Sequence, residues 1–262
     1  MSIGEIATLA VTGLASGILA GFLGIGGGVL LVPMLVYLGY SPIQSAATSS
    51  LAILVTSAVG SLQNWRMGYL SLRRVLLLGF PAIVTAFIGA QVGDWIPSYL
   101  LLLGFGLLLL SNLYLVSLKK RVVAEKTRAE TGSRSSSLSP TAARLITGGT
   151  AGFMAGLFGV GGGVIMVPMQ ILLLNEGIKS AVRTSLGVIV ITSISACVGH
   201  AVNSNIVVLA GLLLGGGGLI GVQISTRFLP KLSDRTVTQL FRGLLLLLSV
   251  LIFWQAWQSY AA

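Results

Sequence analysis

Acidic residues are scarce in this sequence, which holds only six Asp and Glu residues among 262. Cation exchangers normally need carboxylates inside the membrane. Here every carboxylate falls at the end of an apolar run or in the polar linker, so a cation carrier is disfavoured. Paired carboxylates and metal-ligand clusters are also missing, so we expect no metal site, no cofactor and no hydrolase activity. The six residues are Glu5, Asp94, Glu125, Glu130, Glu176 and Asp234.

Charged residues of both signs make up only 8% of the chain, whereas a soluble domain has about 25%. Hydrophobic residues reach 55% and gather in runs near the length that crosses a bilayer as a helix. These features predict an all-α polytopic membrane protein rather than a soluble domain or a β-barrel. The single cysteine, Cys197, excludes an intrachain disulfide.

The net charge of +10 comes mainly from Lys and Arg between the apolar runs. This placement favours the positive-inside bias of membrane loops over nucleic-acid binding. The first basic residue is Arg66, so the N-terminus lacks the basic region that begins a signal peptide. We therefore expect the first apolar run to be a retained membrane segment.

A change in composition predicts two membrane halves joined by a linker. The stretch 119–144 is rich in Lys, Arg, Glu, Ser and Thr and is predicted to be a cytoplasmic polar linker. It separates a first repeat, 1–118, from a second, 145–262. The apolar runs lie near residues 3–38, 43–65, 75–92 and 99–118, and then near 145–174, 178–199, 206–226 and 237–257.

The halves share a motif that interrupts the first apolar run of each. Gly-Ile-Gly-Gly-Gly at 24–28 is followed by Pro33, and Gly-Val-Gly-Gly-Gly at 159–163 is followed by Pro168. The flanking residues match as well, over a duplication of about 110 residues, and transporters are often built from such repeats. The matched pairs include Gly17 with Gly152, Ser45 with Ser180, Ser49 with Thr184, Ser50 with Ser185 and Gln91 with Gln223.

The distribution of basic loops predicts how the broken runs cross the membrane. The loops at 66–74, 119–144, 179–183 and 227–235 are all basic. All of them lie inside only if each broken run enters and returns, as a re-entrant hairpin or as a pair of tilted short spans. Each repeat is then a Gly-broken element plus three transmembrane helices, and the repeats are inverted. The linker lies in the cytoplasm and both termini lie outside.

A glycine break in an apolar helix is tolerated only where protein or a solvated cavity satisfies its backbone groups. A short helix begins after each break, at Val29 and Val164, and helix N-termini favour anions. Neither a dinucleotide fingerprint nor a P-loop fits, because no strand precedes the glycines and no Gly-Lys-Ser/Thr follows them. We expect the two breaks to form a site for a small oxyanion, a reading compatible with a tight turn between packed helices.

Matched polar side chains extend this candidate site. Hydroxyl groups can instead bond to their own helix, amides can hold helices together, and Arg183 is either an interfacial arginine or a bidentate anion ligand. The predicted substrate-binding residues are Gly26, Gly27, Gly28, Val29, Ser49, Ser50 and Gln91 in the first half, and Gly161, Gly162, Gly163, Val164, Arg183, Thr184, Ser185 and Gln223 in the second.

With these residues in hand, the chain resembles the sulfite exporter TauE/SafE family, also called the toluene sulfonate uptake permeases. The resemblance rests on residues 20–28 with Val-Pro-Met at 32–34, on Ala-Ala-Thr-Ser-Ser-Leu at 46–51, and on their second copies. It implies transport of sulfite, sulfonate or sulfoacetate across the bacterial inner membrane, coupled to a gradient of protons or another ion. The leading hypothesis is a secondary carrier with alternating access. A passive anion channel of the same fold is the alternative, and a homo-oligomer is compatible with both.

Overall fold

The structure is a computed structural model that describes residues 3–128 and 139–261, with side chains described for 4–114 and 139–259. All regular elements in these ranges are helices, which confirms the predicted all-α class. They are α1 (Ile3–Leu23), α2 (Gly28–Tyr37), α3 (Pro42–Arg66), α4 (Leu72–Gly93), α5 (Ser98–Arg128), α6 (Pro140–Phe158), α7 (Gly163–Leu173), α8 (Ile178–Val202), α9 (Val208–Phe228), the 3-10 turn η1 (Leu229–Lys231) and α10 (Asp234–Ala261).

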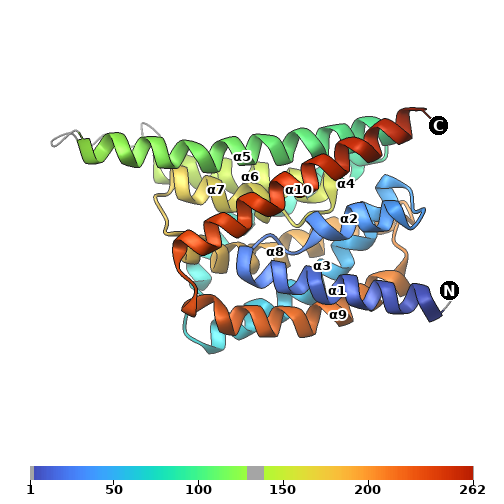
Figure 1. Ribbon diagram of the computed structural model, residues 1–262, viewed down its shortest axis with the longest axis horizontal. Helices are drawn as coiled ribbons and strands as arrows, with labels where there is room; N and C mark the ends of the chain where they lie inside the picture. The colour runs from blue at the N-terminus through green and yellow to red at the C-terminus, as the bar shows by residue number, and fades with distance from the viewer. Residues whose placement is uncertain (1–2, 129–138, 262) are drawn as a thin grey trace.

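Each glycine break turns the chain back on itself (Figure 1). Helix α2 returns alongside α1, so that Leu35 near its end lies in one buried cluster with Leu9 near the start of α1. Helix α7 returns beside α6 in the same way, because Leu174 and Arg144 line one pocket. Each broken run therefore begins and ends at the same end of the bundle, as both of the predicted forms require.

Helix boundaries at the predicted linker differ from the apolar runs. Helix α5 continues to Arg128, beyond the apolar run that ends near 118, because Lys, Arg, Ala and Glu are good helix formers in water. Helix α6 begins at Pro140 rather than near 145, with Ser139 as its N-cap accepting a 3.2 Å hydrogen bond from the amide of Ala142. The remainder of the predicted linker, 129–138, lies outside the described residues.

The loops of one end carry the basic residues, and we call this the basic end. Arg74 of α4 pairs with Glu176 before α8 at 2.8 Å, and Lys179 of α8 bonds the carbonyl of Pro230 in η1 at 3.2 Å. These contacts join the α3–α4, α7–α8 and α9–α10 connections. Helix α1 begins and α10 ends at the opposite end (Figure 1).

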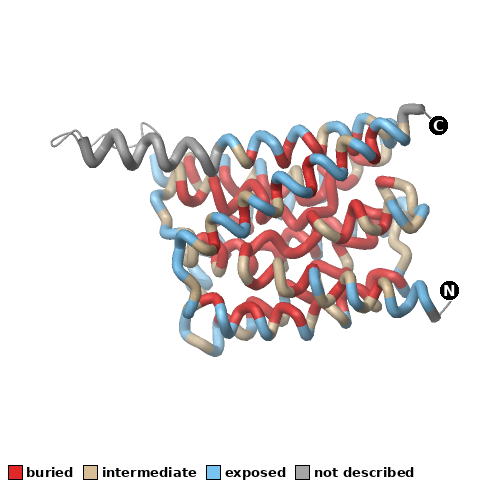
Figure 2. Tube along the Cα trace, in the orientation of Figure 1, coloured by how far each residue is buried: buried red, intermediate tan, exposed pale blue. Residues whose placement is uncertain are grey.

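The helices pack closely through small residues and present apolar side chains outward. Glycine stripes on α1 and α6 lie against α9 and α4, so a methyl group added at Gly17 would collide with the backbone of Gly218. Figure 2 shows buried residues in the interior and exposed ones on outer helix faces, where Phe80 and Leu247 are 77% and 62% exposed. Six described helices, α1, α3, α4, α8, α9 and α10, are long and apolar enough to cross a membrane.

Candidate functional site

The two glycine breaks lie directly against each other. A methyl group added at Gly28, the first residue of α2, would lie 2.5 Å from the carbonyl oxygen of Gly159 and 2.7 Å from the Cα of Val160. One added at Gly163, the first residue of α7, would lie 2.7 Å from the Cα of Ile25. The start of each short helix therefore rests on the break of the other half, as the repeat predicts for a shared site.

Both turns use the same backbone conformation. The N-cap residues of α2 and α7 are Gly27 and Gly162, with φ of 86° and 76°. This left-handed region is readily reached by glycine and rarely by other residues. Space is limited as well, because a methyl group at Gly162 would collide with the carbonyl of Ala151. Conformation and packing together explain why glycine occupies these positions.

Hydroxyl groups satisfy several of the carbonyl oxygens that the breaks leave without helical partners. Ser49 of α3 donates to Gly159 O at 2.6 Å, and Ser185 of α8 donates to Gly24 O. Both bonds cross from one half of the chain to the other. Thr192, which the sequence reading missed, donates to Gly161 O at 3.3 Å. Ser16, also missed, donates at 3.1 Å to Gly27 O, which already accepts from the first-turn amides of α2.

The amide N–H groups at the breaks lack the side-chain partners that several of the break carbonyl oxygens have. Neither N-cap glycine has a side chain to accept from the first turn of its helix. Among the described residues, no acceptor is found for the N–H groups of residues 26–29 or 161–164. These N–H groups are therefore free to act as donors, and such groups bind anions at a helix N-terminus. The carbonyl oxygens of Ile25, Gly26 and Val160 also have no hydrogen-bond donor among the described residues.

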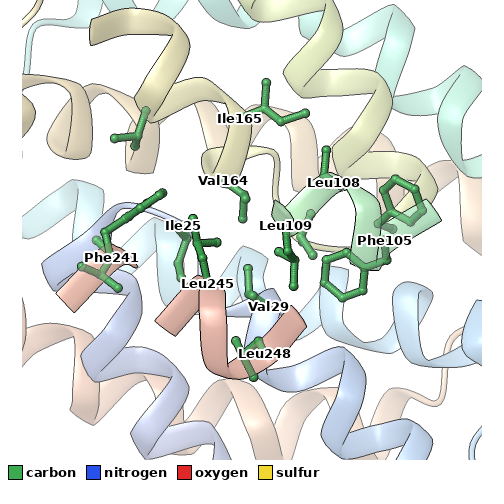
Figure 3. Packing of buried hydrophobic residues seen from close by; sticks show 14 of the residues in the cluster. Ile25, Val29, Phe105, Leu108, Leu109, Val164, Ile165, Phe241, Leu245 and Leu248 are labelled. Atoms are coloured by element: carbon green, nitrogen blue, oxygen red, sulfur yellow. The ribbon is translucent and has the colours of Figure 1, made fainter. Parts of the chain in front are cut away.

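Apolar side chains enclose the paired breaks. Ile53 of α3 and Ile189 of α8 lie against Gly26 and Gly161, with methyl groups 2.9–3.2 Å from the Cβ positions that these glycines lack. The opposite side is covered by a large cluster in which Val29 and Val164 are fully buried. Figure 3 shows this cluster around Ile25, Val29, Val164, Phe105, Leu108, Leu109, Ile165, Phe241, Leu245 and Leu248. A substrate can reach the N–H groups only if these side chains move.

The other predicted hydroxyl residues lie close to the breaks but bond within their own helix or are simply buried. Ser50 donates to Ala46 O in α3 at 2.9 Å, and Thr184 is 3% exposed in α8. Ser50 therefore follows the intrahelical alternative considered for it. Its neighbour Ser49 lies 3.0 Å from Ala46 O of its own helix, but it is closer to Gly159 O, at 2.6 Å.

The two matched glutamines lie at opposite ends of the bundle. Gln91 of α4 donates to Gly199 O of α8 at 2.7 Å, near Asp94, which accepts hydrogen bonds from Asn205 at 2.6 Å and from Asn203. Gln223 of α9 lies at the basic end, where its backbone oxygen accepts from the Gln63 side chain at 3.0 Å. The structure does not bring these amides to the breaks, and the contact of Gln91 holds two helices together.

Arg183 stands next to the break but faces the basic end. Its neighbour Val182 packs on Gly24, while its guanidinium lies 3.9 Å from the ring centre of Tyr69 and its Nε is buried without a partner. The amide of Tyr69 donates to the backbone oxygen of Asn64 at 2.9 Å. Asn64 is fully buried, and both polar atoms of its side chain, like Ser61 Oγ, lack a partner within the described part of the chain.

The sequence reading missed Asn64 and Ser61. The sequence does carry a sign of them, because two uncharged polar residues lie three positions apart, and so on one helix face, at the end of an apolar run. For metals, no group of three or more His, Cys, Asp or Glu residues is close enough to hold an ion in the ranges that the structure covers.

Comparison with known proteins identifies the family. A family model described as sulfite exporter TauE/SafE matches residues 9–252. The probable membrane transporter protein YdhB of Bacillus subtilis is 30% identical over 240 residues, which cover 88% of this chain and 96% of that protein. The chain belongs to the sulfite exporter TauE/SafE family.

Other members of the TauE/SafE family are similar to this chain over longer or shorter stretches. A probable membrane transporter protein of Xylella fastidiosa is 26% identical over 265 residues, covering 98% of each chain. Sulfite exporter TauE/SafE family protein 1 of Arabidopsis thaliana is 32% identical over 84 residues, covering 32% of this chain and 19% of that protein. No solved structure matches the chain. Family membership and the six apolar helices together identify a multi-pass membrane protein from a family of transporters.

Proposed function

We propose that this TauE/SafE protein is a secondary carrier for small sulfur-containing anions of the sulfite, sulfonate or sulfoacetate type. The observation that supports this most is the meeting of two uncapped helix N-termini, α2 and α7, at the centre of the bundle. Their N–H groups carry a partial positive charge, and apolar surroundings strengthen its attraction for an oxyanion. The name of the family model supports sulfur oxyanions as the substrate class.

An inverted relation between the halves supports alternating access. The helix contacts come in matching sets: α1 packs on α9 as α6 packs on α4, and α2 packs on α3 as α7 packs on α8. Inverted repeats place equivalent surfaces on the two sides of the membrane, so exchanging their conformations opens the central site to either side in turn. The basic end is then cytoplasmic, both termini lie outside, and the membrane is the bacterial inner membrane.

Arg183 lies on the proposed path of an anion from the cytoplasmic, basic end to this site. Its unpartnered Nε and the buried amide of Asn64 are polar groups without protein partners, close to Tyr69 and within one residue of the contact with Gly24. A guanidinium matches oxyanions with paired hydrogen bonds. We assign to Arg183 the first contact with an anion that moves from the basic end towards the breaks.

Flux into proteoliposomes at fixed membrane potential tests the proposal. For a carrier we expect saturable uptake of sulfite or a sulfonate that responds to a pH gradient if protons are the coupling ion. Linear, unsaturable flux would indicate the channel alternative. No flux of any of these anions would overturn the transport proposal.

Substitution of the break glycines tests the location of the site. Gly27→Leu and Gly162→Leu should each abolish flux, because a side chain would meet Ser16 or Ala151 and block the uncapped helix end. Gly39→Leu is the matched control, since Gly39 also has a positive φ of 92° but has open space around it. Wild-type flux in either break variant would reject the site assignment, provided that all three proteins insert and purify equally.

A further inference from the structure

A groove on the outer surface of the basic end has features that the transport site does not use. It has a volume of about 420 Å³ and lies between the C-terminal ends of α3 and α9. Arg66 and Arg227 line it together with Gln63 and Gln223. A second groove of about 250 Å³ adjoins it on α9 and shares Gln223 and Arg227.

The lining changes from charged to apolar along the helices. Arg66 and Arg227 stand in the last turns of α3 and α9, at the level where the membrane-spanning segments end. One turn further into the membrane are Leu62 and Ile224, which are 43% and 45% exposed, and Ile220 follows at 56%. This order of a cationic end and an exposed apolar wall matches the headgroup and acyl chain of a phospholipid.

The two arginines lack a negative partner within the described part of the protein. The two acidic residues near the basic end whose side chains are described are already engaged, because Glu176 binds Arg74 at 2.8 Å and Asp234 lies 3.8 Å from Lys179. With a net charge of +10, the chain has few carboxylates to offer from a second copy either. Arg66 and Arg227 are therefore available to an anion from the surroundings.

We propose that this groove binds an anionic phospholipid of the membrane, with its phosphate between Arg66 and Arg227. Basic pockets between transmembrane helices on the cytoplasmic side suit such headgroups, and the arginine fork pairs with phosphate oxygens. The acyl chain lies along Leu62 and Ile224. A bound lipid bridges α3 and α9, which are already joined by the Gln63–Gln223 hydrogen bond, and α9 is the helix that packs on α1.

A transported anion fits this groove less well than a lipid. No residue of the glycine breaks lines the groove, and its exposed apolar wall of Leu62 and Ile224 offers nothing to a small oxyanion. The proposal does not depend on transport and stands if the carrier assignment fails.

Native mass spectrometry of the full chain tests the proposal. The detergent-purified protein is titrated with phosphatidylglycerol and with phosphatidylcholine of the same acyl chains. We expect retention of phosphatidylglycerol, and a loss of roughly tenfold or more in its affinity in the double variant Arg66→Gln/Arg227→Gln, since each basic residue near an anionic headgroup contributes measurably. Lysine at both positions keeps the charge and should preserve most of the binding.

The matched control is Arg73→Gln/Arg235→Gln, which removes two basic residues from the same end but outside both grooves. This control should bind phosphatidylglycerol like the wild type. Equal retention of both lipids by the wild type, equal losses in the two double variants, or unchanged binding by Arg66→Gln/Arg227→Gln would each overturn the proposal. Displacement of the bound lipid by millimolar sulfite would overturn it too, because it would mark the groove as an anion entry.

Discussion

The hydrogen bond from Ser49 to the opposite break provides the sharpest test of how the two halves are joined. Ser49 Oγ lies 2.6 Å from the carbonyl oxygen of Gly159, and both residues are buried. In Ser49→Ala this oxygen loses its donor in a region without water. A buried polar group that loses its partner costs about 1–3 kcal/mol in soluble cores, whereas interhelical bonds in membranes average about 0.6 and reach about 1.7 kcal/mol.

We expect Ser49→Ala to lower the free energy of unfolding by about 1–2 kcal/mol, above the membrane average, because Gly159 O has no other donor among the described residues. Ser50→Ala is the matched control. Ser50 is the next residue on the same helix and is equally buried, but it donates to Ala46 O, which retains its helical N–H partner. Its loss should cost less than about 0.5 kcal/mol.

Reversible unfolding of the purified protein in mixed micelles measures both variants. Ser185→Ala, which removes the reciprocal bond to Gly24 O, should behave like Ser49→Ala. The double variant should lose less than the two single losses together, since both bonds hold the same pair of breaks. Equal stabilities of Ser49→Ala and Ser50→Ala would refute the reasoning, because the cross-half bond would then contribute nothing beyond an intrahelical one.

Three further predictions use the same unfolding measurement. Gly28→Ala should lower the free energy of unfolding by about 1–3 kcal/mol through overpacking, because its methyl group would lie 2.5 Å from Gly159 O. The control is Gly216→Ala, which has open space around it and should stay within about 1 kcal/mol of the wild type. Equal losses in the two variants would contradict this prediction. Gln255→Leu should cost less than about 1 kcal/mol, although it removes the 2.8 Å bond to Pro33 O, because Pro33 lies inside α2 and the substitution also removes Gln255 Oε1, which is buried without a partner; a loss above about 2 kcal/mol would contradict it. Glu176→Gln should cost less than about 1 kcal/mol, because Arg74 in this ion pair is 51% exposed; a loss above about 2 kcal/mol would show a larger role.

The sequence predicts the breaks and their pairing because glycine clusters in apolar runs have few structural explanations. Repetition of the motif predicts that the two breaks share one position. The sequence places Ser49 and Ser185 in the candidate substrate site, and the structure shows their hydroxyl groups donating to the break carbonyls. Ser16 and Thr192 were missed, since nothing in the local sequence distinguishes a serine that caps a distant carbonyl from one that bonds to its own helix. Their partners are set by packing between helices far apart in the chain.

The matched glutamines show the limit of reasoning from a repeat. Gln91 and Gln223 align in the sequence but lie at opposite ends of the bundle. Under the inverted relation proposed above, equivalent residues occupy opposite sides of the membrane, and they converge only near its middle. Gly28 and Gly163 meet this condition. Equivalence therefore supports a shared site only for residues close to the breaks.

The boundaries of α5 and α6 were less predictable for a different reason. Apolar runs mark the part of a helix that lies in the membrane, not the whole helix. Helix α5 continues through charged residues to Arg128, and α6 begins in the Ser139–Pro140 cap ahead of its apolar run. A capping serine followed by proline marks a helix start in the sequence itself, so Ser139 and Pro140 carry the signal for this boundary.

The hydrogen bonds at the breaks bear on the proposal that the site takes an anion rather than a cation. A broken helix exposes both carbonyl oxygens and N–H groups, and half-helix C-termini with unwound carbonyls are the usual cation ligands of such folds. Here hydroxyl groups occupy the carbonyls of Gly24 and Gly159, while the donors at the starts of α2 and α7 have no protein acceptor among the described residues. Removing the hydroxyl groups would return acceptors to the centre and weaken its preference for anions. Ser49→Ala/Ser185→Ala should therefore lower anion affinity as well as stability, whereas a scaffold without transport would lose stability alone.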